Sequence, residues 1–188
     1  RILFLGEGFE ACQATLGQRP GLIGCYTVPE AQARFIKAPR GSFDPSGPDD
    51  AVLQLYTSGT TGNPKGAVLS NRNLFGLRKA GLENPAPHSL WDEDEAVLVA
   101  MPCAHIGVTG LCIVALAAGL PGIVLSEFEP TRVFDAVENR GVTRFFIVPA
   151  ALQMLLNHPD CASTDFSRIK YILYGASPIP LELLRQCI

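Results

Sequence analysis

From residue 96 onward, short apolar runs alternate regularly with stretches of helical character, and this alternation constrains the fold more than any other feature of the sequence. The expected strands span 96–101, 122–125, 144–148 and 169–174, and the expected helices span 108–118, 130–140 and 150–157, with one more from residue 181 onward. Pro130 at the first helical position and Gly141 just past the last one are typical of helix ends. Repetition of strand, helix and strand at this spacing predicts an α/β fold with a mainly parallel, doubly wound sheet flanked by helices.

The segment 96–126 contains no Asp, Glu, Lys or Arg, and it is long enough to raise the question of a membrane span. Two prolines and four glycines interrupt it, and it also contains His105. We therefore expect a buried strand, a loop, a buried helix and a second strand. The strands of a parallel sheet that is covered on both faces are apolar in this way. No transmembrane segment is predicted.

The residues before 96 predict a more varied set of elements. The expected elements are a strand at Ile2–Leu5 followed by a helical stretch, a surface linker at 38–50, a strand at Ala51–Tyr56, a short returning strand at Ala67–Leu69, a helix capped by Ser70 or Asn71 that ends near Leu82, and an exposed loop at 83–95. The linker is predicted because its sequence, APRGSFDPSGPDD, is rich in turn-forming residues. The acidic run DEDE beside Trp91 is interpreted as a solvated turn.

The segment Tyr56–Gly66, YTSGTTGNPKG, has the chemistry of a phosphate-binding loop. It combines three glycines and five hydroxyl side chains with one lysine. Glycines allow close approach of a backbone to a ligand, hydroxyls donate hydrogen bonds, and lysine adds a point charge, a combination that suits a polyphosphate. The segment is not a Walker A loop, because Pro64 stands where that pattern requires glycine and Gly66 follows Lys65.

Two further loops also follow expected strands directly. The loop at 102–107 follows the strand at 96–101, and the loop at 175–178 follows the strand at 169–174. Open α/β sheets bind ligands outside the carboxyl ends of their strands. If the strand at Ala51–Tyr56 is parallel to these two, all three loops gather at one edge of the sheet and form a site.

The three loops together resemble the adenylate-forming superfamily, which includes acyl- and aryl-CoA synthetases, firefly-type luciferases and the adenylation domains of peptide synthetases. YTSGTTGNPKG is similar, nearly residue for residue, to its signature loop. MPCAHIGVTG resembles its P-x-F-H-x-x-G loop, with Ala104 in place of the usual aromatic residue, and YGASPIP resembles its G-A-x-P loop. The resemblance implies that residues 1–188 are a single partial domain, with the rest of the large N-terminal domain and the small C-terminal domain absent from this sequence.

The resemblance also implies a role for each site residue. Lys65 is the expected catalytic residue, because it would neutralise charge on the leaving pyrophosphate, and Thr57 is expected to contact the magnesium that accompanies ATP. His105, Ala104 and Gly107 are expected to border the pocket for the acid. The residues expected to bind ATP are Thr57, Ser58, Gly59, Thr60, Thr61, Gly62 and Gly66 around the phosphates, and Gly175, Ala176, Ser177 and Pro178 against the adenine and ribose.

The activity that the resemblance implies is a two-step ligation. A carboxylic acid is activated by ATP as an acyl-adenylate, and coenzyme A then takes the acyl group. A carboxylic acid with a pKa of about 4–5 is already ionised at neutral pH, so the first step needs no general base. The alternatives are a ligase that loads a carrier protein and a catalytically inactive nucleotide-binding relative. We expect the 188-residue chain to be inactive by itself, because other motifs of the family should follow Ile188.

The composition excludes several other classes of partner. The net charge of −3 provides no basic surplus for nucleic acid. The six cysteines form no C-x-x-C pair, which argues against a zinc site and against a disulfide framework. Reduced thiols in a cytoplasmic protein are therefore expected. The expected partners are small molecules: a carboxylic acid, ATP and coenzyme A.

Overall fold

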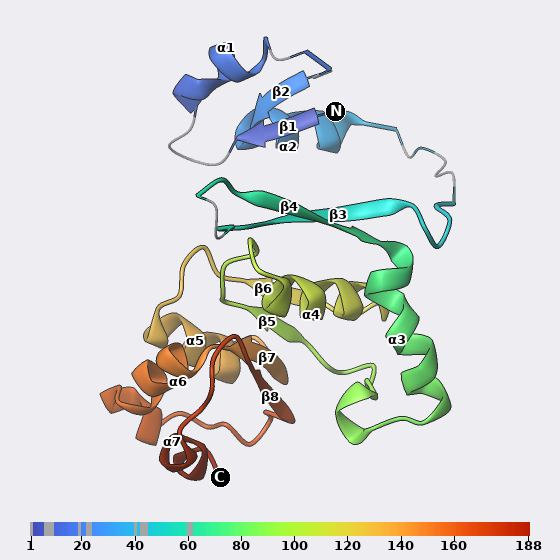
Figure 1. Cartoon of the computed structure of the whole chain (residues 1–188). Coiled ribbons are helices and arrows are strands. Elements are labelled where there is room, and N and C mark those ends of the chain that lie inside the picture. The colour runs from blue at the N-terminus through green and yellow to red at the C-terminus, as the bar shows by residue number, and fades with distance from the viewer. Residues whose placement is uncertain are drawn as a thin grey trace. The chain divides into compact units, whose positions relative to one another are not determined.

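The computed structural model describes residues 2–5, 10–18, 20–21, 24–39, 41, 45–59 and 62–188. The chain divides into two compact units, Arg1–Pro45 and Ser46–Ile188, which are described separately below (Figure 1). The boundary between the units falls within the range 38–50 that the sequence predicts as a linker.

The first unit is a small parallel pair of strands with short helices. Strands β1 (Ile2–Leu5) and β2 (Gly24–Thr27) pair in parallel, which confirms the strand predicted at Ile2–Leu5. The remaining elements are η1 (Glu10–Cys12), α1 (Gln13–Leu16) and α2 (Val28–Lys37). Helix α2 begins with a capping box, in which the Thr27 backbone N–H donates to Glu30 Oε2 at 2.9 Å. This hydrogen bond lowers the pKa of Glu30.

The second unit opens with an antiparallel hairpin of β3 (Ala51–Thr57) and β4 (Lys65–Ser70). Helix α3 (Asn71–Glu83) follows directly. Ser70 N and Oγ both lie within hydrogen-bonding distance of Asn73 Oδ1 at the start of this helix. The predicted strands and helix are confirmed, but in the described part of the chain β3 and β4 pair only with each other. Strand β3 is therefore not part of the parallel sheet from which the other two loops leave.

The main body of the second unit is a four-stranded parallel sheet in the order β6–β5–β7–β8. The strands are β5 (Val97–Val99), β6 (Gly122–Val124), β7 (Arg144–Ile147) and β8 (Tyr171–Tyr174), and the helices are η2 (Pro87–Ser89), α4 (Ile106–Ala117), α5 (Pro130–Asn139), α6 (Pro149–Leu156), η3 (Pro159–Ala162) and α7 (Leu181–Gln186). All pairings within this sheet are parallel. The predicted parallel α/β architecture is confirmed for this region, with strand β5 shorter than the expected 96–101.

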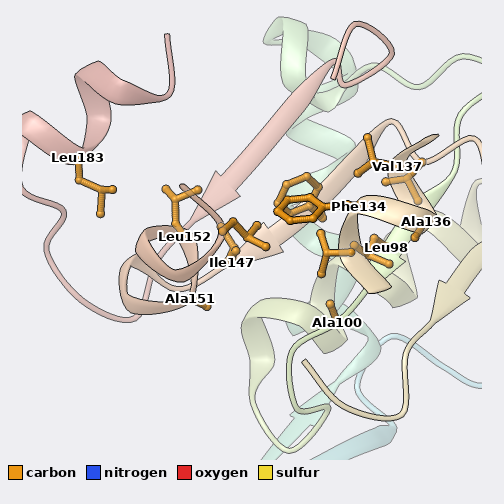
Figure 2. Packing of buried hydrophobic residues seen from close by; sticks show 13 residues of the cluster. Leu98, Ala100, Phe134, Ala136, Val137, Ile147, Ala151, Leu152 and Leu183 are labelled. Atoms are coloured by element: carbon orange, nitrogen blue, oxygen red, sulfur yellow. The ribbon is translucent and has the colours of Figure 1, made fainter. Parts of the chain in front are cut away.

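The helices cover both faces of this sheet, and β5 contributes alternate residues to the two sides of the core. Leu98 belongs to the larger apolar cluster, which includes residues of α5, α6 and α7 such as Phe134, Leu152 and Leu183 (Figure 2). Val97 and Val99 belong to a second cluster with Val108 and Ala115 of α4. Because successive side chains of a strand point to opposite faces, a strand covered on both sides must be apolar throughout.

The uncharged segment 96–126 consists of β5, the following loop, α4 and β6, as the sequence predicts. Strand β5 is buried throughout, whereas Gly122 and Val124 of β6 are exposed. Within the described ranges, no helix is long and apolar enough to cross a membrane.

Candidate adenylate-forming site

The signature segment is a loop held between the ends of the β3–β4 hairpin. Thr57, the last residue of β3, stands directly opposite Lys65, the first residue of β4, and Thr57 Oγ1 donates to the Lys65 carbonyl at 3.5 Å. Both residues are exposed. Ser58, Gly59 and Gly62 are described, whereas Thr60 and Thr61 lie outside the described residues. Lys65 and the Thr57 hydroxyl thus lie side by side where the loop begins and ends, so that one polyphosphate could contact both.

Two glycines of this loop are required by the turn itself. Gly62 has φ +83°, in the left-handed region that favours glycine, and its N–H donates to the Gly59 carbonyl at 3.2 Å. A Cβ at Gly59 would lie 2.5 Å from the Asn63 carbonyl oxygen and 3.4 Å from Lys65 Cγ. The Lys65 side chain therefore runs back over Gly59, toward the loop, because Gly59 leaves room for it.

The loop after β5 places His105 at the start of helix α4. His105 is the N-cap residue, and its carbonyl accepts from the Thr109 N–H at 3.3 Å. The Thr109 hydroxyl in turn donates to the Cys103 carbonyl at 2.7 Å, which ties the loop to the first turn of the helix. His105 and Ala104 are both exposed. This arrangement holds the imidazole at the carboxyl edge of the sheet, in contact with solvent.

The loop after β8 leaves the sheet at the same edge. Its residue Ala176 has φ +69°, a left-handed conformation that is uncommon for a residue with a side chain. Strand β7 is the one strand between β5 and β8, so the two loops start about 10 Å apart. The predicted convergence at one edge is confirmed for the loops of His105 and Gly175 by the parallel pairing of their strands.

Phe146 of β7 lies between these two loops, and it is outside the motifs that the sequence patterns identify. A Cβ at Gly107 would lie 2.5 Å from Phe146 Cζ, and a Cβ at Gly175 would lie 3.2 Å from Phe146 Cε2. Both glycines therefore make room for the same aromatic ring. The strand order could have revealed this residue, because a side chain at the carboxyl end of the middle strand must lie between the loops of its neighbours.

A network of buried charges lies at the opposite, amino-terminal edge of the sheet. The Arg144 guanidinium pairs with the Glu95 carboxylate, and the two side chains are 2% and 1% exposed. Arg144 also donates to the carbonyls of His88 and Leu90. Its guanidinium carbon lies 4.2 Å from the ring centroid of Trp91 and 4.5 Å from that of Tyr171.

This network corrects the interpretation of the acidic run as a solvated turn. Asp92 and Asp94 are exposed, but Glu95 is buried. Lys170 Nζ lies 2.7 Å from Asp92 Oδ2 and 3.5 Å from Glu95 Oε1. Burial raises the pKa of Glu95, but the hydrogen bonds from Arg144 and from the Asp92 backbone, together with the positive charges of Arg144 and Lys170, hold that pKa below its ordinary value. The hydrogen bond between Lys170 and Asp92 lowers the pKa of Asp92 and raises that of Lys170.

The described side chains include no group of three or more His, Cys, Asp or Glu residues that could hold a metal ion. The Thr57 hydroxyl lies at the mouth of the signature loop, so it could reach a cation that arrives with a nucleotide. All six cysteines are free thiols.

Comparison with known proteins identifies the family. The sequence model described as "AMP-binding enzyme" matches residues 15–188, and the chain belongs to this family. It is 36% identical over 163 residues to a feruloyl-CoA synthase of an Amycolatopsis species, covering 81% of this chain and 32% of the relative. It is 35% identical over 141 residues to the fatty acid–[acyl-carrier-protein] ligase ScoC of Streptomyces coeruleorubidus, covering 75% and 27%. The resemblance to adenylate-forming enzymes is thereby confirmed.

Solved structures share the fold. The N-terminal domain of FACL13 from Mycobacterium tuberculosis superimposes with a TM-score of 0.81 at 21% identity, over 98% of this chain and 46% of that chain. The o-succinylbenzoate coenzyme A synthetase MenE from Bacillus subtilis, solved with AMP, has a TM-score of 0.72 at 24% identity, over 99% and 45%. The chain spans about a third of the length of the curated relatives it matches.

Proposed function

We propose that the enzyme containing this chain is an AMP-forming acid–thiol ligase. The carboxylate of an organic acid attacks the α-phosphorus of ATP, pyrophosphate leaves, and the thiol of coenzyme A then displaces AMP from the acyl-adenylate. The observation that carries this proposal is the intact YTSGTTGNPKG segment, with Thr57 and Lys65 held opposite each other at the ends of the hairpin. Relatives named as feruloyl-CoA synthase and indoleacetate–CoA ligase support the reaction class.

In this proposal the signature loop aligns the reacting anions. Lys65 neutralises charge on the departing pyrophosphate, and the hydroxyls of Thr57 and Ser58 donate to its oxygens. The same role is proposed for Thr60 and Thr61, with backbone N–H groups of the loop glycines as further donors. Magnesium would spread the phosphate charge, and Thr57 is the residue of this chain that we propose to contact it. The first step needs no base from this chain, because the acid arrives ionised.

The carboxyl edge of the parallel sheet is the proposed place for the acid and the nucleoside. His105, Ala104 and Gly107 border the acid. The Phe146 ring lies against both Gly107 and Gly175, and so separates the acid from the sheet below it. The backbone of Gly175, Ala176, Ser177 and Pro178 packs against the adenine and ribose. The left-handed conformation of Ala176 supports this assignment, because such strain collects at ligand-binding loops.

The test is acid-dependent exchange of radiolabelled pyrophosphate into ATP by the full-length enzyme, measured over a panel of carboxylic acids. Replacing Lys65 with alanine should reduce exchange by about 100-fold or more, as expected for removal of one group that stabilises transition-state charge. Lys37→Ala, which removes an exposed lysine of the first unit, is the matched control and should leave exchange unchanged. Full exchange by Lys65→Ala would remove Lys65 from the mechanism.

A second candidate function is transfer of the acyl group to a carrier protein. It is supported by the 35% identity to an acyl-carrier-protein ligase. Supplying the enzyme with coenzyme A or with a carrier protein after the adenylate has formed separates the two, because only the true acceptor becomes acylated. An enzyme that binds ATP but shows no exchange with any acid would instead be an inactive relative.

Six free thiols support our proposal of a cytoplasmic location.

A further inference from the structure

One face of the β3–β4 hairpin carries side chains that the proposed mechanism does not use. In an antiparallel pair, residues two apart on a strand share a face with their partners across the ladder. Tyr56 stands opposite Gly66 and Gln54 stands opposite Val68, so these four residues share one face. Thr57 and Lys65 lie on the other face. The hairpin thus presents Thr57 and Lys65 on one face, and the polar side chains of Gln54 and Tyr56 on the opposite face.

The Gln54 side chain crosses this second face diagonally and lies over Gly66. A Cβ placed at Gly66 would collide with Gln54 Nε2 and would lie 3.1 Å from Gln54 Cδ. Gln54 Nε2 also donates to the Tyr56 hydroxyl at 3.0 Å. The Gln54 amide therefore occupies the space that a side chain at residue 66 would enter, and it also holds the Tyr56 hydroxyl. Because Gln54 is exposed, a larger residue at position 66 would displace the amide rather than the backbone.

These contacts lie directly behind the two ends of the signature loop. Tyr56 immediately precedes Thr57, and Gly66 immediately follows Lys65, so any shift of the Tyr56–Gly66 pair moves both phosphate-binding residues. The antiparallel pairing of β3 with β4 already joins the two ends of the loop, and the Thr57 hydroxyl bond to the Lys65 carbonyl, at 3.5 Å, adds little to it. The Gln54 amide over Gly66 adds a side-chain contact across the same pair of strands.

We propose that Gln54 is a positioning residue for ATP binding, and that it acts through its contact with Gly66, the residue that follows Lys65. The proposal rests on the proposed function, since it assumes that the signature loop binds ATP. It assigns a role to a residue outside YTSGTTGNPKG and adds to the role expected for Gly66, which the sequence places among the nucleotide-binding residues.

The first experiment measures the dissociation constant of ATP by calorimetry for the full-length enzyme and for Gln54→Met. Methionine keeps the length of the side chain and removes its hydrogen-bond donor. We expect ATP affinity to fall about fivefold, the loss that corresponds to one net hydrogen bond. Gln153→Met is the matched control, because Gln153 Nε2 also donates one exposed side-chain bond, to Asn157 Oδ1 at 3.1 Å on helix α6. The control should bind ATP as the unsubstituted enzyme does.

The second experiment is a cycle of Gln54→Ala, Gly66→Ala and the double variant. If Gln54 acts through its contact with Gly66, Gly66→Ala displaces the Gln54 amide and weakens ATP binding in the natural background, and it has no further effect once Gln54 is alanine. An equal loss in both backgrounds would overturn the proposal, because Gly66 would then act independently of Gln54. Unchanged ATP affinity of Gln54→Met would overturn it as well. An unsubstituted enzyme that binds no ATP would refute the proposed function itself, and the inference with it.

Discussion

Replacing Arg144 with methionine tests whether the buried charge network at the amino-terminal edge of the sheet holds β5 and β7 together. The substitution removes the guanidinium from between Trp91 and Tyr171 and leaves the Glu95 carboxylate, which is 1% exposed, without its main partner. Breaking a buried pair in this way costs about 3–5 kcal/mol. Lys170 Nζ remains 3.5 Å from Glu95 Oε1, so the lower end of that range, about 3 kcal/mol, is expected.

The matched control is Arg72→Met. Arg72 makes two hydrogen bonds to the Asp49 carboxylate, at 2.8 and 3.0 Å, but these side chains are 61% and 77% exposed. An exposed pair contributes about 0–1 kcal/mol, so the same chemical change should have little effect. The double variant Arg144→Met/Glu95→Leu should recover the penalty for the unpaired carboxylate. It should retain a loss of about 1–3 kcal/mol, because the carbonyls of His88 and Leu90 still lack their donor.

The assay is urea unfolding of the 188-residue chain, followed by far-UV circular dichroism and by fluorescence. Trp91 is the single tryptophan of the sequence and stacks on Arg144, so its emission reports this network directly. The change in the free energy of unfolding is read from the shift of the midpoint at constant slope. Equal losses for Arg144→Met and Arg72→Met would refute the reasoning, because burial would then make no difference to the cost.

Because the pKa values of Asp92 and Glu95 are lowered, these carboxylates stabilise the fold above about pH 4, and the contribution is lost as the pH falls further. The raised pKa of Lys170 adds stability below about pH 10 that is lost at higher pH. Urea midpoints should therefore decline at both extremes of pH and be flat between them. Gly107→Ala should lower thermal stability and acid-dependent exchange, because the new methyl group collides with the Phe146 ring of β7. Gly110→Ala in the same helix is the control: its methyl group meets no atom closer than 3.7 Å, so it should be neutral or stabilising. Equal melting temperatures of the two variants would contradict this prediction. The purified 188-residue chain should show no pyrophosphate exchange, and measurable exchange would prove it sufficient for catalysis.

Local sequence patterns were enough to predict most helices and strands. The strand β5, the helix that begins at Pro130 and the returning strand after the signature loop all follow from apolar runs, turn residues and caps, which are properties of neighbouring residues. Strand boundaries differed by up to two residues, because the end of a strand depends on its partner. Residues 65 and 66 belong to β4 since they pair with Thr57 and Tyr56, and the sequence of β4 alone carries no sign of that pairing.

The candidate site divides in the same way. The motif YTSGTTGNPKG identified the family from sequence, a result that the match to residues 15–188 confirms. The convergence of the His105 and Gly175 loops was predictable from strand direction. The placement of β3 in a separate hairpin was not, because an apolar strand followed by a loop is compatible with either sheet.

The sequence by itself determined the α/β class, the family and the residues proposed to meet ATP, because these depend on short-range periodicity and on one contiguous motif. Only the tertiary structure decided that Glu95 is buried against Arg144, that Phe146 lies between two loop glycines and that Gln54 covers Gly66. Each of these contacts joins residues that are distant along the chain or that lie on different strands. Their chemistry depends on burial and on cross-strand register, which the chain acquires only when its strands pair.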